Sequence, residues 1–548
     1  MDYNYLADLL FPKVAYTEEE LEAKYPPRNL KEGAIVSRMA PSPTGFVHLG
    51  NLLQAVTSER LAHQSGGVLF LRVEDTDQKR EVPGAVEILV NSVKHYNVNF
   101  DEGATVDGEF GIYGPYRQRL RKDIYHVYAR RLVLEGKAYP CFCTEEELAK
   151  NHQMQEESKE NFGYYGKWAV WRDRSIEDIK DALNKGMPWV LRFRSTGSIE
   201  NKIKFTDFIK GSLELTENDI DHVLLKSDGI PTYHFAHAVD DHLMRTTHVI
   251  RGDEWLSTFP FHIQLFQALG FRLPKYLHIG PLMKMDGDSK RKLSKRKDPE
   301  ASLTFYKTEG YPSESLYEYI LTTLNSNFED WRRMNPTAST DEFKFSYKKM
   351  NPAGSLFDEA KLKDVSKNVI SRMTAEKVYD LSSEWAKEFD KDLYNAMSAD
   401  CEYTKNIFAI GRGGKKPRKD LTVWTDVRTY IDFFYDELFT VKDQYKDSFD
   451  VNDIKSTLCE FIKTFDISDD MNTWFEKIKD IADMLGYASD MKAYKENPDA
   501  YKGNVSDIST FIRIAITGKE NSPDMYSVIQ ILGYDRVVNR IKNMINSL

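Results

Sequence analysis

The sequence predicts a multidomain α/β protein in which a core built on a parallel sheet precedes an all-helical C-terminal part. Three observations predict this class: a strand–helix–strand pattern near the N-terminus, a length of 548 residues, and helical periodicity in almost every segment after about residue 350. A chain of this length is expected to form several compact units. With 41% hydrophobic and 29% charged residues, it has the composition of a globular protein that buries several cores.

The strand–helix–strand pattern begins at 34–40, where a mostly apolar run indicates a buried strand. The loop 41–45 contains two prolines, and apolar residues then recur at helical spacing over 49–61 until a glycine pair ends the helix. Residues 68–73 indicate a second strand. Two strands joined by a helix at this spacing favour a parallel sheet.

The other segments follow in order. Residues 1–33 are polar and are expected to form an extension before the first core strand. The mixed and charged stretch 141–225 suits an inserted domain, and core-like segments return at 222–225 and 248–250. Helices are expected throughout 351–548, which is long enough for two subdomains; examples are 453–465 and 526–532.

Composition excludes several classes of protein. No segment approaches the ~18 uninterrupted apolar residues of a membrane span, and the first residues lack the features of a secretory signal. Four cysteines in 548 residues make no disulfide framework, so reduced thiols and a cytoplasmic location are expected. The net charge of −10 argues mildly against a nucleic-acid partner without excluding one, because a basic face can lie on an acidic protein.

The first candidate site is the segment 40–50, between the first strand and its helix. A helix N-terminus offers unpaired N–H groups and the positive end of a dipole, which favour phosphate. His48 would lie within reach of that phosphate, and Gly50 would let a nucleotide approach without a clashing Cβ. The alternative is a capping loop with an incidental histidine.

The second candidate is the segment 290–297, in which all residues except Leu293 and Ser294 are cationic. This density of charge can neutralise a triphosphate in a transition state. The alternative is a solvated basic loop, which is what a run of like charges usually forms.

Two further segments contain metal-ligand residue types. The segment 228–242 includes His234, His237, Asp241 and His242, but it lacks HExxH spacing and equally suits helix packing with satisfied histidines. Cys141 and Cys143 could begin a zinc site, whose conceivable partners downstream are His152, Tyr164 and Tyr165. Plain buried thiols are favoured over structural zinc.

The first two candidates together resemble the paired signatures of class I aminoacyl-tRNA synthetases. His48-Leu49-Gly50-Asn51 looks like the HIGH element, and Lys292-Leu293-Ser294-Lys295-Arg296 looks like the KMSKS element. The stretch 40–45, APSPTG, is similar to the bacterial-type glutamyl branch, whereas glutaminyl and archaeal-type glutamyl enzymes usually carry a Pro-Glu-Pro variant there.

Further stretches match the same branch, so that the resemblance runs from about residue 34 to the C-terminus; they are 71–77, 228–242, 250–256, 357–362 and 513–518. There are departures. Asn51 occupies the fourth HIGH position, Arg296 the last KMSKS position, and the remaining cysteine of a zinc motif found in some members is absent. Residues 1–33 have no counterpart in the usual pattern.

The resemblance implies a Rossmann-like class I synthetase catalytic core with an inserted acceptor-binding domain, followed by all-α anticodon-binding domains. The implied segments are the catalytic halves 34–140 and 226–280, the acceptor-stem-binding insertion 141–225, the KMSKS-type loop and stem-contact region 281–350, and the anticodon-binding region 351–548. The basic loop 411–419 is a candidate RNA contact, with a solvated flexible loop as its alternative.

The resemblance also implies a reaction: L-glutamate is activated with ATP and Mg²⁺ and transferred to tRNA(Glu). A monomer is expected, although the sequence leaves the oligomeric state open. Whether tRNA(Gln) is also charged stays open. The implied catalytic residues are His48, Lys292 and Lys295. The implied ATP-binding residues are Ala40, His48, Gly50, Glu254, Lys292 and Lys295. The implied glutamate-binding residues are Arg38, Ser42, Glu74, Tyr233 and Arg251.

Four other functions fit parts of the sequence. A truncated paralogue that glutamylates a tRNA base, or a small nucleotidyltransferase of the same fold, would have no need of the helical residues 351–548. A synthetase-like binding protein without activity should have lost His48, Lys292 or Lys295. A metallohydrolase using 234–242 is the most remote alternative.

Overall fold

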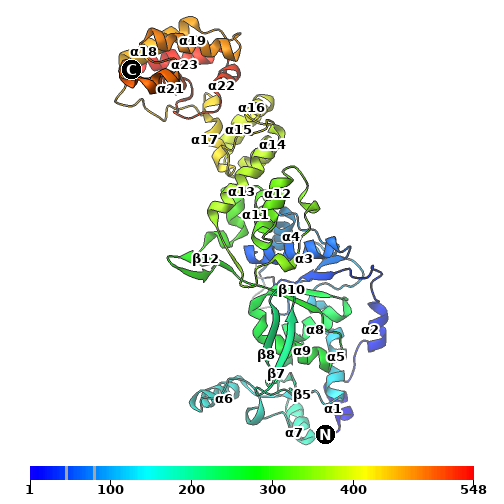
Figure 1. The fold of residues 1–548 in the computed structure, drawn as a ribbon. Coiled ribbons are helices and arrows are strands. Elements are labelled where there is room, and N and C mark those ends of the chain that lie inside the picture. The colour runs from blue at the N-terminus through cyan, green and yellow to red at the C-terminus, as the bar shows by residue number, and fades with distance from the viewer. Residues whose placement is uncertain (44–46, 78–81, 295) are drawn as a thin grey trace. The chain divides into compact units, whose positions relative to one another are not determined.

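The computed structural model describes residues 1–43, 47–77, 82–294 and 296–548. It separates into two compact units (Figure 1). The first unit comprises Met1–Phe305 and Tyr317–Asp358, and the second comprises Tyr306–Leu316 and Glu359–Leu548. Within the described ranges, no helix is both long enough and apolar enough to cross a membrane.

A parallel sheet forms the core of the first unit, as the strand–helix–strand pattern predicts. Its parallel strands are β1 (Val36–Met39), β2 (Val68–Leu71), β3 (Glu102–Ala104), β10 (His248–Gly252) and β11 (Lys275–Ile279). β1 pairs with β2, β2 with β3, and β10 with β11, and β3 also pairs antiparallel with the short β4 (Glu109–Phe110). The backbone N–H of Thr247 donates to the carbonyl of Val36 at 2.9 Å, so β10 lies beside β1. The carboxyl ends of these strands therefore meet at one edge.

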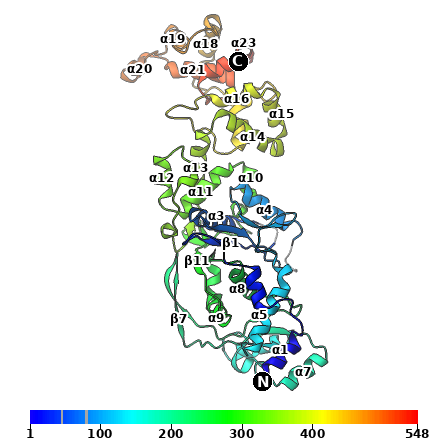
Figure 2. The same cartoon turned by 90° about the vertical axis from the view of Figure 1, so that its right-hand side faces the viewer.

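The predicted helix after β1 is α3 (Leu49–Gln64), which packs on β1, β2 and β10. Figure 2 shows α3 beside β1. His48 caps it: the ring Nδ1 accepts the backbone N–H of Asn51 at 3.1 Å, and the Asn51 side chain accepts the N–H of His48 at 3.2 Å. This reciprocal pair satisfies two amides at the helix N-terminus and fixes where the helix begins.

Helices from distant parts of the sequence complete this core. They are α1 (Tyr3–Leu10), α2 (Glu18–Lys24), α4 (Ala85–His95), α5 (Lys122–Leu134), α8 (Tyr233–Leu243) and α9 (Phe259–Ala268). The N-terminal extension is thus structured, with α1 packed against α5. Leu21 and Tyr25 are fully buried in the same hydrophobic cluster as Phe70 of β2.

The expected insertion forms an antiparallel sheet of β5 (Ala138–Cys141), β6 (Val190–Phe193) and β9 (Val223–Leu225). The core-like segment 222–225 therefore belongs to this sheet and not to the parallel one. The same region contains α6 (Glu145–Glu157), α7 (Ile176–Asn184) and a two-stranded ribbon of β7 (Lys202–Asp207) and β8 (Gly211–Thr216).

After β11 the chain forms a small sheet of β12 (Leu282–Asp286), β13 (Ser289–Lys292) and β14 (Ser355–Leu356). The basic segment 290–297 thus starts within a strand. Arg291 donates two hydrogen bonds to the Asp298 carboxylate, at 2.6 and 2.8 Å, and the backbone N–H of Ser294 donates to the same carboxylate at 2.8 Å. Asp298 therefore holds the described ends of this segment together.

The helical prediction for the C-terminal part is confirmed. The helices after β13 are α10 (Leu303–Glu309), α11 (Ser313–Leu324), α12 (Phe328–Met334), α13 (Glu359–Arg372), α14 (Ala375–Phe389), α15 (Lys391–Ala399), α16 (Cys401–Ala409), α17 (Thr425–Ile431), α18 (Val451–Thr464), α19 (Met471–Met484), α20 (Met491–Glu496), α21 (Val505–Thr517), α22 (Met525–Leu532) and α23 (Tyr534–Ser547). The predicted helices 453–465 and 526–532 are α18 and α22. Short 3-10 helices are η2 (Gln118–Arg121), η3 (Gly166–Trp168), η4 (Asp253–Thr258), η5 (Pro299–Ala301), η6 (Thr340–Glu342), η7 (Tyr347–Lys349), η8 (Asp432–Phe434) and η9 (Pro498–Ala500).

The turn before β14 requires glycine, which yields a prediction. Gly354 has φ +89°, and a Cβ there would lie 2.2 Å from the carbonyl oxygen of Pro281, which no backbone contact allows. We expect Gly354→Ala to lower the free energy of unfolding by about 2–4 kcal/mol, because a clash adds to the left-handed strain. Gly186→Ala is the control, since Gly186 has φ +68° but a Cβ there would have no atom of the described residues within 4 Å. Equal losses in urea unfolding of the two variants would show that the close contact contributes nothing.

Candidate active site

Two adjoining cavities lie at the carboxyl edge of the parallel strands, and Gln54 of α3 lines both. The larger has a volume of about 260 Å³, and its lining includes His48, Gly50, Gly252, Glu254, Gly280 and Lys292. The smaller has a volume of about 70 Å³, and its lining includes Arg38, Ala40, Glu74, Tyr233, Arg251 and Trp255. This edge is where parallel α/β sheets place their ligands.

The larger cavity is lined by a helix N-terminus and by a lysine. The N-terminus of α3 opens on it at His48 and Gly50, and Lys292 enters from β13 with its side chain 64% exposed. The Lys292 Nζ lies 3.9 Å from a carboxylate oxygen of Glu254, a weak pairing that leaves the ammonium group accessible. A Cβ at position 50 would lie 3.0 Å from the His48 ring, so glycine leaves that ring its space. A helix N-terminus beside a lysine is suited to a phosphate chain.

The smaller cavity contains buried charge. Arg251 is only 4% exposed, yet among the described residues no carboxylate lies within ion-pair distance of it. Its Nε donates to Nε2 of His278 at 3.0 Å, and Nη1 lies 3.2 Å from Nδ1 of His262 and 3.5 Å from the hydroxyl of Tyr233. Its Nη2 is buried and has no partner in the described part of the chain. The guanidinium is therefore held by neutral groups while one donor stays available.

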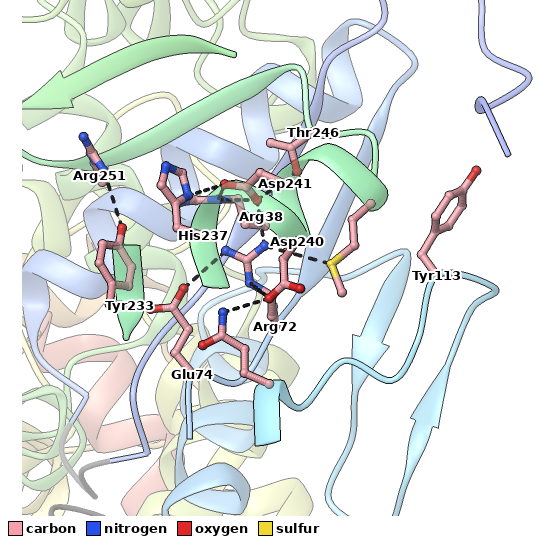
Figure 3. A network of polar contacts seen from close by, with 12 residues as sticks. Arg38, Arg72, Glu74, Tyr113, Tyr233, His237, Asp240, Asp241, Thr246 and Arg251 are labelled. Carbon is pink, nitrogen blue, oxygen red and sulfur yellow. Dashed lines mark hydrogen bonds and ion pairs between the residues drawn. The ribbon is translucent and has the colours of Figure 1, made fainter. Parts of the chain in front are cut away.

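Behind this cavity lies a network centred on Asp241 of α8 (Figure 3). Asp241 accepts from Arg72 at 2.6 Å and from Arg38 at 3.3 Å, and Nδ1 of His237 lies 2.5 Å from its carboxylate. Arg72 also donates to Glu74 at 3.2 Å. Burial works to raise the pKa of Asp241, but the Arg72 and Arg38 guanidiniums hold it well below its usual range. Asp241 is therefore ionised and fixes both arginines.

The neighbouring Asp240 extends the network away from the cavity. Its carboxylate accepts from Arg121 at 2.6 Å, from Tyr125 at 2.8 Å and from Gln118 at 2.9 Å. Arg121 in turn approaches the hydroxyl of Tyr25 at 3.5 Å. These side chains are fully buried, so the charges are compensated by hydrogen bonds and not by water.

The structure brings most of the predicted site residues together. His48, Gly50, Glu254 and Lys292 line the larger cavity, whereas the predicted ATP residue Ala40 lines the smaller one. Arg38, Glu74, Tyr233 and Arg251 line the smaller cavity, while Ser42 is exposed and is not among its lining residues. Lys295 and residues 44–46 lie outside the described residues, so the prediction for Lys295 stays a prediction.

Sequence reasoning missed several residues of the site. Asn51, Gln54 and Ser58 line the smaller cavity from α3. These residues follow His48 at intervals of three or four, which places them on one face of the helix. That spacing is the signal in the sequence that points to them. His278 was also missed, because it carries no motif and contacts Arg251 only across two paired strands.

The candidate metal residues contact other groups. His234 pairs with His262 at 2.8 Å, and His242 contacts Glu22 at 2.6 Å. The sulfurs of Cys141 and Cys143 lie 3.4 and 3.5 Å from the Tyr164 hydroxyl. Across the described ranges, no three His, Cys, Asp or Glu side chains are grouped so that they could hold a metal ion.

The basic loop 411–419 has mixed contacts. Arg412 donates to the carbonyl of Ile370 at 2.7 Å, and Arg418 pairs with Asp420 at 2.6 Å. Both arginines are therefore tied to the protein itself. Lys415, Lys416 and Lys419 are exposed and keep the loop a candidate RNA contact.

Comparison with known proteins gives matches over the whole chain. Residues 34–364 match the family described as tRNA synthetases class I (E and Q), catalytic domain, and residues 416–545 match an anticodon binding domain. The glutamate–tRNA ligase of Acetivibrio thermocellus is 50% identical over 549 residues and covers 100% of both chains. That of Sorangium cellulosum is 46% identical and covers 95% of this chain and 97% of its own. A solved glutamate-tRNA synthetase from Elizabethkingia anophelis is 26% identical with a TM-score of 0.74, covering 94% of this chain and 100% of its own.

The buried carboxyl of Glu74 yields a prediction about pH. Burial raises its pKa from 4.5 to about 7, although Arg72 and Arg38 work to lower it. The raised pKa means that the folded state favours the neutral form, so this contribution to stability is complete below about pH 4.5 and is lost as the pH rises to about 7. Relative to the native chain, Glu74→Gln should therefore gain about 2–3 kcal/mol of stability between pH 5 and pH 8. The measurement is thermal unfolding of both proteins at several pH values. A stability difference between Glu74→Gln and the native chain that stays constant from pH 5 to pH 8 would contradict the prediction.

Proposed function

Because the chain belongs to the class I tRNA synthetases of the E and Q group, we propose that it is a glutamate–tRNA ligase. It activates L-glutamate with ATP to glutamyl-adenylate and diphosphate, and then transfers the glutamyl group to the 3′ end of tRNA(Glu), with tRNA(Gln) as an open second acceptor. Relatives at 50% and 46% identity over nearly the whole chain carry this name. The predicted fold class is confirmed: a class I synthetase catalytic region is followed by an all-α anticodon-binding region.

The larger cavity is assigned to ATP, which enters with Mg²⁺ as a substrate complex. His48 and the backbone amides near Gly50 bind the phosphates, and Glu254 contacts the nucleotide. Lys292 stabilises the charge that develops on the α-phosphate and on the leaving diphosphate, which is an electrostatic role and not a proton transfer. Lys295 is assigned the same role from its place in the KMSKS-like element alone. The N-terminus of α3 and Lys292 in its lining support the assignment of this cavity.

The smaller cavity is assigned to glutamate, and Arg251 is the observation that carries this assignment. A guanidinium whose buried Nη2 has no partner among the described residues is complementary to the side-chain carboxylate of glutamate and not to the neutral amide of glutamine. Arg38 meets the other carboxylate and Glu74 the α-amino group, while Tyr233 bounds the pocket. Ser42 is retained for glutamate and Ala40 for ATP from their motif positions, and Ala40 lines the smaller cavity.

The remaining regions are assigned to tRNA. Residues 141–225 grip the acceptor end and 351–548 read the anticodon, which the match of 416–545 to an anticodon binding domain supports. The stretch 281–350 contacts the stem. We propose that it acts in the cytoplasm as a monomer. Structural zinc is not part of the proposal.

Charging assays with purified tRNA(Glu) and tRNA(Gln), each with glutamate and with glutamine, test the function. We expect glutamate to be attached to tRNA(Glu) and glutamine to be rejected with both tRNAs. Glutamate on tRNA(Gln) would broaden the tRNA choice without changing the amino acid. Faster charging with glutamine than with glutamate would overturn the proposal.

The ATP assignment predicts a loss of rate on removal of Lys292. Lys292→Ala should lower kcat for adenylate formation by ~10²-fold, the usual scale for losing one preorganised charge-stabilising group. Folding should not change, because the side chain is 64% exposed. Lys290→Ala, on the same strand but outside the cavity lining, is the control and should stay near the native rate. A Lys292→Ala enzyme with near-native kcat would remove this residue from the mechanism.

The glutamate assignment predicts a change of specificity at Arg251. Arg251→Ala should raise KM for glutamate strongly and reduce the glutamate-to-glutamine ratio of kcat/KM, because the discriminating charge is lost. Arg251→Lys should rescue only part of both, since a point charge cannot form a fork. The measurement is kcat/KM for both amino acids with tRNA present. An unchanged ratio in Arg251→Ala would direct the role to Arg38.

A further inference from the structure

Arg251 is held by a chain of two buried residues that no motif includes. Arg251 of β10 lies directly opposite His278 of β11 in the parallel pairing, and its Nε donates to His278 Nε2 at 3.0 Å. On the other side of the imidazole, Nδ1 lies 2.8 Å from the carboxylate of Asp207, the last residue of β7. His278 is 0% and Asp207 1% exposed. The order carboxylate, imidazole, guanidinium is thus fixed in the protein interior.

Geometry determines the protonation of the imidazole. Asp207 also accepts the backbone N–H of His278 at 3.1 Å, which fixes the carboxylate beside Nδ1. A carboxylate accepts, so Nδ1 carries the proton; a guanidinium N–H donates, so Nε2 is the bare acceptor. Burial lowers the pKa of His278, although the Asp207 hydrogen bond works against this shift. The imidazole is therefore a neutral acceptor toward Arg251 at neutral pH.

This arrangement orients Arg251 without neutralising it at contact distance. Arg72 and Arg121, by comparison, each contact an aspartate directly at 2.6 Å and are committed to the network behind the cavity. Arg251 donates to His278 through Nε alone. The Nη groups project from it, with Nη1 close to His262 and Tyr233 and Nη2 without a partner among the described residues. A carboxylate in place of His278 would compete with any anionic ligand for the same guanidinium.

We propose that Asp207 and His278 are positioning residues that aim the Arg251 guanidinium at the side-chain carboxylate of the amino-acid substrate, and so set the discrimination between glutamate and glutamine. The inference rests on the proposed function. Asp207 reaches this position because the β7–β8 ribbon of the insertion ends beside β11: the backbone N–H of Phe208 donates to the carbonyl of Tyr276 at 3.0 Å. The discrimination between glutamate and glutamine thereby depends on Asp207, which lies in the insertion 141–225 that is expected to bind the tRNA acceptor end.

The test compares substitutions at His278. His278→Phe keeps an aromatic ring but removes the acceptor, and should raise KM for glutamate ~10-fold and lower the glutamate-to-glutamine ratio. KM for ATP should not change, because the ATP cavity does not include this residue. His278→Gln should have a smaller effect, since its amide can accept from Arg251 and donate to Asp207. His248→Phe, on the same strand as Arg251 but bonded to Thr247, should leave KM for glutamate unchanged.

The double variant with Arg251→Lys separates positioning from a general structural role. Lysine has no Nε–H at that place, so His278→Phe should add nothing to KM for glutamate in the Arg251→Lys background. Additive effects, or equal increases in KM for glutamate and ATP, would overturn the inference. If His278→Phe does not fold, His278→Met takes its place with the same expected outcomes. The failure of the proposed function would instead be visible in the native protein, as an absence of glutamate charging.

Discussion

The adjacent acids Asp240 and Asp241 on α8 are the constraint on which the catalytic unit depends. Each carries a charge fully removed from solvent, and such a charge is tolerated only when it is paired and hydrogen-bonded. Asp241 therefore fixes Arg72 of the loop after β2 and Arg38 of β1, while Asp240 fixes Arg121 of η2. The cavity wall is set in place by electrostatics before any substrate arrives.

The same interior contains two kinds of arginine, and the difference explains how specificity can arise. Arg72 and Arg121 are saturated by carboxylates and act as structural cross-links. Arg251 is surrounded by imidazoles and a phenol, and burial keeps those imidazoles neutral: it lowers the pKa of His278 and holds that of His262 well below its usual range. A buried cation whose neighbours cannot neutralise it favours an anionic ligand over a neutral one of equal shape.

Much of this architecture could be predicted from the sequence, and the remainder could not for identifiable reasons. The βαβ unit, the helical tail and most of the cavity residues follow from local periodicity and short motifs, which act within a few residues. Arg72, Asp207 and His278 were beyond reach, because their roles depend on contacts between strands and helices far apart in the chain. The apolar segment 222–225 does contribute Leu224 and Leu225 to the hydrophobic core, but a short apolar run does not reveal that its strand joins the antiparallel sheet of β5, β6 and β9.

The N-terminal extension shows what motif-based reasoning omits. Residues 1–33 match no family signature, yet Tyr25 is fully buried, and its hydroxyl donates to the carbonyl of Gly114 at 2.9 Å. Arg121 contacts both the Tyr25 hydroxyl and the Asp240 carboxylate, so it links the extension to the acids Asp240 and Asp241. Arg28 adds a two-bond pair to Glu102 of β3, at 2.7 and 3.0 Å. These contacts support the buried network on the side that faces away from the amino-acid pocket. The extension therefore belongs to the catalytic unit through its packing and hydrogen bonds, although no motif assigns it there.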